Sequence, residues 1–276
     1  LDDRFLLVEH RDGGMAAMQW FYDYCVANNY VKRAQLDRNP RFDSHGLTVT
    51  INLAKPEFKN MKKAAAGNAV AGGYPKCTIC HENEGFAGRD KRTLRTLPVT
   101  LGGESWFWQF SPYGYFPEHL IVASREHRPM AIDHGTIARL LDFTDAYPRW
   151  FIGSNADLPI VGGSLLGHDH FQGGGHRFPL MNVPIARAFS IEGLESVEAG
   201  IVRWPASVVR LRSCDRRLLA EAACRVLDAW RPFSFEECDI RAFSLVPDDG
   251  REGAVSASGV LASPARFVQH NTANPI

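Results

Sequence analysis

The stretch that decides how this chain is built is SNADLPIVGGSLLGHDHFQGGGH, residues 154–176. It holds the segment HDHFQ between two groups of glycines. If HDHFQ is an extended strand, His168, His170 and Gln172 lie on one face, because alternate side chains of a strand point to the same side. Neighbours in this row are then roughly 6.5–7 Å apart, too far for the two imidazoles to hydrogen-bond to each other. We therefore expect the two histidines to have separate roles.

The residue types in this row suit chemistry at phosphorus. A histidine with an ordinary pKa of about 6.5 is largely neutral at pH 7, so it can attack phosphorus or bind a metal. A carboxamide such as Gln172 can donate to a phosphoryl oxygen on which charge develops, and glycines let backbone N–H groups approach phosphate. The alternative is that the two histidines form only a half-exposed polar face. We favour phosphoryl or nucleotidyl transfer through a histidine, because Gln172 and the glycines accompany the pair.

Composition limits the class of protein. The chain has 276 residues, of which 45% are hydrophobic and 22% are charged, as is typical of a globular protein with room for a large core. Its formal net charge is zero and its pI is about 7.3, so no general positive field draws nucleic acid. No apolar run reaches the roughly 18 residues of a membrane span, and no signal peptide is recognisable. We therefore expect a cytoplasmic protein that binds neither membrane nor nucleic acid.

Hydrophobic patterns predict a mixture of helices and strands. Helices are predicted over 18–26, after Asp133, and over 219–230, and strands over 97–111, 119–124, 150–153, 200–204 and 207–211. Because the two kinds of element do not alternate regularly, the sequence indicates an α+β fold. We expect residues 1–245 to form one domain. Residues 246–276 are predicted to form a flexible loop.

A single CxxC motif, Cys77-Thr78-Ile79-Cys80, is open to three interpretations. It can be a redox centre, half of a zinc site, or two buried thiols. The redox interpretation requires a thioredoxin-like βαβ context, which the surrounding sequence lacks. No second CxxC follows, so a zinc site would take its remaining ligands from histidines.

The histidine stretch resembles the active-site signature of a known family. SNADLPIVGGSLLGHDHFQGG is similar, nearly without gaps, to the signature of the galactose-1-phosphate uridylyltransferases of the second, Gram-positive-type class, which belong to the histidine-triad superfamily. CTICHENEGFAG and EAGIVRWPASVVRLRS are further similar stretches, so the resemblance extends over most of the chain. It implies a histidine-triad-like antiparallel sheet flanked by helices.

The resemblance also implies a ping-pong reaction of galactose metabolism, in the Leloir pathway. UDP-glucose gives its uridylyl group to a histidine and releases glucose 1-phosphate, and galactose 1-phosphate then takes the group to form UDP-galactose. By motif, His170 is the nucleophile, and a backbone carbonyl or similar acceptor should hold its other ring N–H. Gln172 would hydrogen-bond the transferred phosphate.

Four further residues are expected to bind substrate. Asn155 and Ser164 match family positions that contact phosphate oxygens, although the spacing from the serine to the first histidine differs by one residue between the two classes. Gly163 belongs to the glycines whose backbone can approach phosphate. Arg89 lies in a basic turn and is a candidate for neutralising diphosphate charge, the alternative being a solvated charged turn.

The same resemblance completes a zinc site. His127 takes the place of a zinc-binding histidine that follows a strand in relatives, and His168 is the first histidine of the HxHxQ motif. With Cys77 and Cys80 they make a Cys2His2 set, which suits a closed tetrahedral structural site. His119 is the fallback for His127. The competing interpretation is that this branch keeps the ligands and has lost the metal.

Two other functions stay open on the sequence. A nucleoside-diphosphate-sugar phosphorylase or hydrolase would use the same nucleophile with phosphate or water as the acceptor. A zinc-stabilised nucleotide-binding module without turnover is the alternative from another class. Relatives are commonly dimers and continue beyond the stretch HNT at residues 270–272. The resemblance therefore implies a homodimer, with residues 246–276 as the start of a C-terminal half that is truncated or missing.

Overall fold

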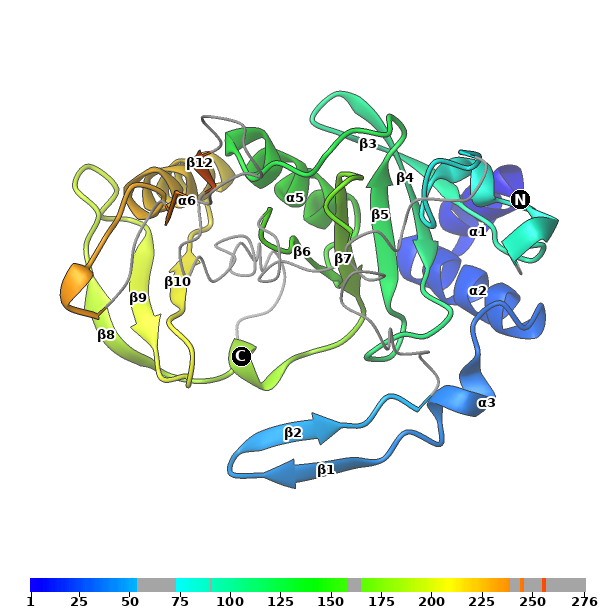
Figure 1. Ribbon diagram of the computed structural model, residues 1–276, viewed down its shortest axis with the longest axis horizontal. Coiled ribbons are helices and arrows are strands. Elements are labelled where there is room, and N and C mark those ends of the chain that lie inside the picture. The colour runs from blue at the N-terminus through cyan, green and yellow to red at the C-terminus, as the bar shows by residue number, and fades with distance from the viewer. Residues whose placement is uncertain (54–72, 90, 158–164, 239–243, 246–254, 257–276) are drawn as a thin grey trace.

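A computed structural model describes the chain outside the segments 54–72, 90, 158–164, 239–243, 246–254 and 257–276 (Figure 1). The helices of the described residues are α1 (Asp2–Asp12), α2 (Gly14–Ala27), α3 (Arg33–Leu36), α5 (His134–Ala146) and α6 (Arg216–Trp230), with short 3-10 turns η1 (His81–Asn83), η2 (Ala87–Arg89), η3 (Pro179–Met181) and η4 (Glu236–Cys238). The strands are β1 (Arg41–Ser44), β2 (Leu47–Thr50), β3 (Leu97–Leu101), β4 (Glu104–Phe110), β5 (Leu120–Ser124), β6 (Phe151–Gly153), β7 (His170–Gly174), β8 (Ile185–Phe189), β9 (Glu198–Val202), β10 (Val209–Arg212), β11 (Ser244–Leu245) and β12 (Val255–Ser256).

The largest sheet of the described residues has five antiparallel strands in the order β3-β4-β5-β7-β6. The predicted strand over 97–111 is in fact two strands, because Gly102 and Gly103 adopt positive φ and turn the chain back on itself. β7 lies inside the sheet, hydrogen-bonded on both sides, and a strand held this way has a well-defined position. The prediction of an α+β fold is confirmed.

The main core lies where α1 and α2 pack against the aromatic strand β4. The helix predicted over 18–26 is confirmed within α2, and its side chain Phe21 meets the ring of Trp108 edge-on at 5.2 Å. Tyr22 meets Phe110 in the same way at 5.0 Å. Trp108 and Phe110 belong to β4 and are completely buried, so this helical aromatic stripe is core.

Helix α5 joins the main sheet to a second, smaller sheet. The helix predicted after Asp133 is confirmed, and Asp133 caps it, because its carboxylate accepts from the backbone N–H of Thr136 and completes a capping box. Leu140 and Phe143 belong to the main core, whereas Leu141, on another face of the same helix, belongs to a second core shared with α6. α6 covers the sheet β10-β9-β8, which stands at some distance from the main sheet in Figure 1.

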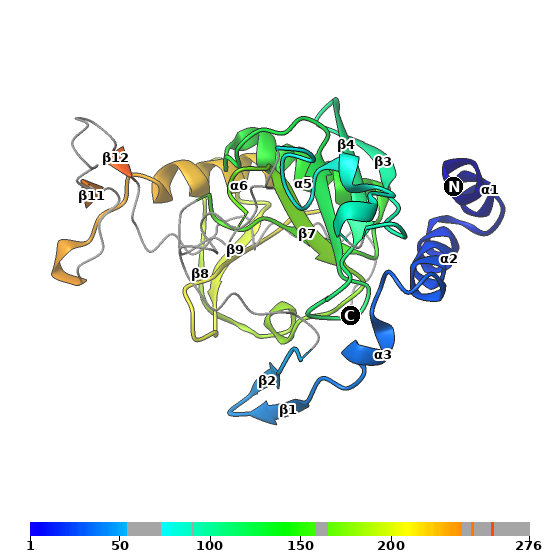
Figure 2. The same cartoon turned by 45° about the vertical axis from the view of Figure 1, so that its right-hand side comes forward.

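The hairpin β1–β2 projects from this body, as Figure 2 shows, and its strands pair only with each other among the described residues. Phe42 in this hairpin is 49% exposed. None of the helices in the described part of the chain has the length and apolar character of a membrane span. The expected boundary after residue 245 falls between β11 and β12, which pair with each other, and most of 246–276 lies outside the described residues.

Candidate functional site

His170 is the first residue of β7 and lines a large pocket. Its Cα pairs with that of Ala123 in β5, and only 6% of the residue is exposed. Nδ1 lies 2.8 Å from the carbonyl oxygen of His168, which is the kind of acceptor that the sequence predicts. Because a carbonyl oxygen can only accept, Nδ1 carries the ring proton and Nε2 keeps its lone pair. Burial lowers the pKa of His170 and favours this neutral ring.

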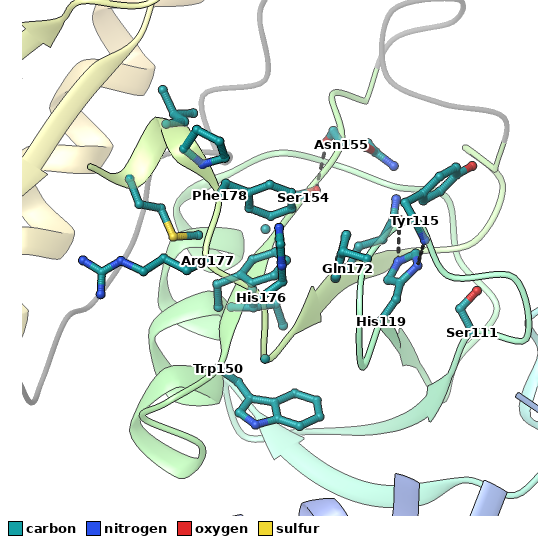
Figure 3. Close-up of a pocket in the computed structure, with 18 of the residues that line it drawn as sticks. Ser111, Tyr115, His119, Trp150, Ser154, Asn155, Gln172, His176, Arg177 and Phe178 are labelled. Atoms are coloured by element: carbon teal, nitrogen blue, oxygen red, sulfur yellow. Dashed lines mark hydrogen bonds between the residues drawn. The ribbon is translucent and has the colours of Figure 1, made fainter. Parts of the chain in front are cut away.

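Gln172 lies two residues further along β7 and lines the same pocket. Its Oε1 is 3.0 Å from Nε2 of His119, and Tyr115 N–H lies 3.4 Å from Nδ1 of that ring (Figure 3). His170 and Gln172 therefore share one face, as predicted. The prediction that His168 belongs to the same row is wrong, because the strand begins only at His170 and His168 sits in the bend before it.

The bend turns the ring of His168 into a cluster with Cys77, Cys80 and His127. Nδ1 of His168 is 3.2 Å from Sγ of Cys77 and 3.7 Å from Sγ of Cys80. Nδ1 of His127 is 3.1 Å from Sγ of Cys80, and the two sulfurs are 3.4 Å apart. Nε2 of His168 donates to the carbonyl oxygen of Ser124 at 2.8 Å, so Nδ1 is the atom left to bind a metal.

The dimensions of this cluster fit a tetrahedral metal. All four ligand atoms lie within 4.8 Å of one another. Zinc bonds of about 2.0–2.3 Å imply tetrahedral edges of about 3.3–3.8 Å between ligands. The separations of 3.1 to 3.7 Å are close to this range, so only the wider pairs would have to contract to close the set. Two thiols and two imidazoles are also the donor types that zinc prefers. The cluster can hold a metal, with His127 as the third ligand, and the fallback His119 lies elsewhere, against Gln172.

The pocket above His170 and Gln172 has a volume of about 1560 Å³. Its lining residues come from the strands β5, β6 and β7, from the hairpin β1–β2, and from β10 with the segment after β7. Its lining is strongly basic. Among the described lining residues the only acid is Asp43, whereas the arginines are Arg41, Arg149, Arg177, Arg210 and Arg212.

These arginines favour an anionic ligand, because a cleft lined by charges of one sign concentrates the opposite charge. Arg210 is held in place by hydrogen bonds from its guanidinium to the carbonyl oxygens of Val183 and Leu180, at 2.7 and 2.8 Å. Desolvation lowers the pKa of Arg210, which means that its charge is partly buried. Sequence reasoning missed Arg210 and Arg212, although their alternation in a predicted strand could have placed them on one face.

An aromatic group lies at the far end of β7. The ring of His176 stacks on that of Phe116 at 5.6 Å. The ring of Phe178 meets those of His176 and Phe116 at 4.8 and 5.2 Å, and Figure 3 labels His176 and Phe178. All three residues line the pocket. Their grouping was not predictable from the sequence, because it depends on how the segment before β5 and the segment after β7 pack together.

The other predicted substrate-binding residues have mixed outcomes. Asn155 lines the pocket, just after β6. Gly163 and Ser164 lie outside the described residues. Arg89 ends η2, and its side chain is outside the described part of the chain. Their roles stay predictions.

A neutral histidine, a donor amide and an arginine-lined pocket define a class of site for a phosphorylated ligand, and comparisons with known proteins name the family. The family profile described as "Galactose-1-phosphate uridyl transferase, N-terminal domain" matches residues 9–137. A curated galactose-1-phosphate uridylyltransferase of Bifidobacterium longum is 63% identical over 261 residues, which cover 95% of this chain and 50% of the relative. The chain belongs to the galactose-1-phosphate uridylyltransferase family.

Two more distant relatives carry the same name. That of Halalkalibacterium halodurans is 47% identical, covering 85% of this chain and 48% of the relative. That of Caldanaerobacter subterraneus is 40% identical, covering 99% of this chain and 51% of the relative. The chain thus spans about half the length of these curated relatives. No solved structure matches it.

Proposed function

We propose that this chain carries the uridylyl-transfer site of a UDP-glucose–hexose-1-phosphate uridylyltransferase. The observation that supports this most directly is the hydrogen bond from Nδ1 of His170 to the carbonyl of His168. It leaves Nε2 unprotonated on a buried, neutral ring that lines an arginine-rich pocket. Such a nitrogen is an activated nucleophile. Membership of the uridylyltransferase family supplies the substrates, UDP-glucose and galactose 1-phosphate.

In the first half-reaction, Nε2 of His170 attacks the α-phosphorus of UDP-glucose. The bond from that phosphorus to the bridging oxygen breaks, and glucose 1-phosphate leaves with the electron pair. The uridylylated ring is cationic, and the His168 carbonyl that accepts from Nδ1 stabilises this charge. In the second half-reaction a phosphate oxygen of galactose 1-phosphate attacks the same phosphorus and restores the neutral ring.

The remaining side chains of the pocket stabilise charge and hold the substrates. The amide N–H groups of Gln172 donate to a non-bridging oxygen of the transferred phosphoryl group, where negative charge develops. The lining arginines offset the charge of the diphosphate and of the departing sugar phosphate. Asn155, Gly163, Ser164 and Arg89 are proposed to contact the phosphates as well.

We further propose that zinc occupies the cluster of Cys77, Cys80, His127 and His168. Bound zinc would supply a structural cross-link and would take no part in the transfer. His168 has two functions in this arrangement, because its ring joins the cluster and its carbonyl orients His170. The metal site thereby sets the position of the nucleophile.

Metal analysis tests the zinc site. Protein purified without chelator should contain about one equivalent of zinc, and Cys80→Ser should lose it. The control Cys214→Ser changes an exposed cysteine outside the cluster and should keep the zinc. Well under one equivalent in the unmodified protein, with no loss of circular dichroism in a strong chelator, would exclude a structural zinc.

The cellular setting is proposed on the same basis. Residues 1–245 form the uridylyltransferase domain, and the protein acts in the cytoplasm as a homodimer. Free, buried Cys77 and Cys80 support a reducing compartment, where thiols stay available for a metal. Light scattering during size-exclusion chromatography tests the dimer, and a monomer at micromolar concentration would contradict it.

The covalent step is tested by mass spectrometry. The protein is incubated with UDP-glucose alone and quenched in alkali, because a phosphoramidate on histidine is labile in acid. One uridylyl adduct is expected, absent in His170→Ala and present in the control His134→Ala, which changes an exposed histidine on α5. Adduct in His170→Ala, or none in the folded, zinc-loaded protein, would refute the proposal.

Discharge of the adduct then identifies the acceptor. Galactose 1-phosphate should remove the uridylyl group and yield UDP-galactose. Faster discharge by inorganic phosphate would indicate a phosphorylase, and discharge by water alone a hydrolase.

A further inference from the structure

His119 is buried beside the proposed site without belonging to the zinc cluster. It directly precedes β5, is 4% exposed, and its ring lies 4.5 Å from that of Phe116 and 5.5 Å from that of Tyr115. The backbone of Gly114 also lies close to His119, because a Cβ added at this glycine would be only 2.8 Å from Cβ of His119. The imidazole is therefore held in one place by packing.

The two hydrogen bonds of this ring fix which of its nitrogens donates and which accepts. The backbone N–H of Tyr115 points at Nδ1 from 3.4 Å, and a backbone N–H can only donate, so Nδ1 accepts. A neutral ring that accepts at Nδ1 carries its proton on Nε2. Nε2 lies 3.0 Å from Oε1 of Gln172, and its N–H therefore donates to that oxygen (Figure 3).

This direction decides which end of the Gln172 amide faces the pocket. With Oε1 bound to His119, the NH2 group is the end left for a ligand. In the opposite orientation, Oε1 would face phosphoryl oxygens and repel them, while the NH2 group would meet the N–H of the ring. A free glutamine has no such preference, because its two amide ends have nearly the same shape.

We propose that His119 is a positioning residue, which holds the amide of Gln172 with its NH2 group toward the transferred phosphoryl group. His119 does not touch the substrate in this arrangement and acts through Gln172. The inference rests on the proposed uridylyl transfer.

Three substitutions of similar size separate positioning from packing. His119→Gln keeps an N–H donor near the place of Nε2, His119→Met has no donor, and His119→Glu offers an acceptor that draws the NH2 group of Gln172 away from the pocket. The rate of adduct formation at saturating UDP-glucose should fall in the order Gln, Met, Glu. A lost oxyanion donor costs about 100- to 1000-fold, so we expect roughly a tenfold loss for His119→Met and a loss approaching that of Gln172→Met for His119→Glu.

The effect should lie in the rate at saturation, with a smaller change in the concentration of UDP-glucose that gives half the maximal rate. In the Gln172→Met background the three variants should have equal rates, because the residue through which His119 acts is gone. Circular dichroism and zinc content confirm that each variant is folded, and if His119→Glu is not, the comparison of Gln with Met decides.

Equal losses in all three variants, or the same order without Gln172, would overturn the positioning role. Failure of the proposed function looks different, because the unsubstituted protein would then form no adduct.

Discussion

Replacing Phe171 by alanine should destabilise the fold by about 3–5 kcal/mol. Phe171 lies between His170 and Gln172 in β7, so its side chain points away from the pocket into the main core. It is 1% exposed, and its ring stacks on Trp106 at 4.8 Å with the planes 9° apart. Alanine removes this ring from a stack that the surrounding sheet holds in place. The protein then loses the free energy gained by burying the ring, and the cavity that remains adds a further cost.

Two control variants separate the cavity from other effects. Phe171→Leu keeps much of the volume and should lose less than about 1.5 kcal/mol. Phe42→Ala removes a half-exposed ring from the projecting hairpin and should change stability by no more than about 0.5 kcal/mol.

Urea denaturation, followed by tryptophan fluorescence and by circular dichroism, measures these differences. The alanine variant should have a lower midpoint with an unchanged slope, provided that both signals give one transition. A typical domain has only about 5–15 kcal/mol of stability, so the loss is easily detected. A loss below about 1 kcal/mol, or equal losses for alanine and leucine, would refute the argument that this stack supports the strand of the site.

Three further predictions test particular local features. Gly173→Ala should destabilise the fold by about 1–3 kcal/mol, because the added Cβ would clash with the carbonyl oxygen of Phe151 on the neighbouring strand. In the control Gly167→Ala the added Cβ would meet nothing within 4 Å, so the urea midpoint should change little. Asp133→Ala should cost about 1 kcal/mol through loss of the cap of α5, and an unchanged melting temperature would contradict it. Burial raises the pKa of Tyr147 to about 12, from about 10 in the unfolded chain. The folded protein therefore holds this proton to higher pH than the unfolded chain does. As the pH rises from about 10 to about 12, the free energy of unfolding should fall by about 2–3 kcal/mol. In Tyr147→Phe this part of the alkaline loss should be absent from urea midpoints measured along the same pH series.

Local elements were predictable because their signals are local. The helix after Asp133 combines a capping residue with apolar positions at helical spacing, and both features act within a few residues. The helix over 219–230 was predicted in the same way and lies within α6, capped by Asp215. The start of β7 was harder to predict, because the period-two pattern of HDHFQ continues through the bend at His168, before the strand begins at His170.

By itself the sequence determined which chemical groups are available. The cysteine pair, the two histidines around Asp169 and the glutamine after them predicted a nucleophile, a donor and metal ligands, because ligand preference and nucleophilicity are properties of the side chains themselves. The α+β class was also predictable, because the spacing of hydrophobic residues indicates whether each segment is a helix or a strand.

Only the tertiary structure decided how these groups divide the work. Whether His119 or His127 joins Cys80 depends on contacts between segments far apart in the chain, and the structure directs His127 to the cluster and His119 to Gln172. The basic lining of the pocket likewise combines Arg41 of β1 with Arg210 and Arg212 of β10, which are far apart in the chain. Such contacts result from the packing of whole elements, which no local pattern of residues encodes.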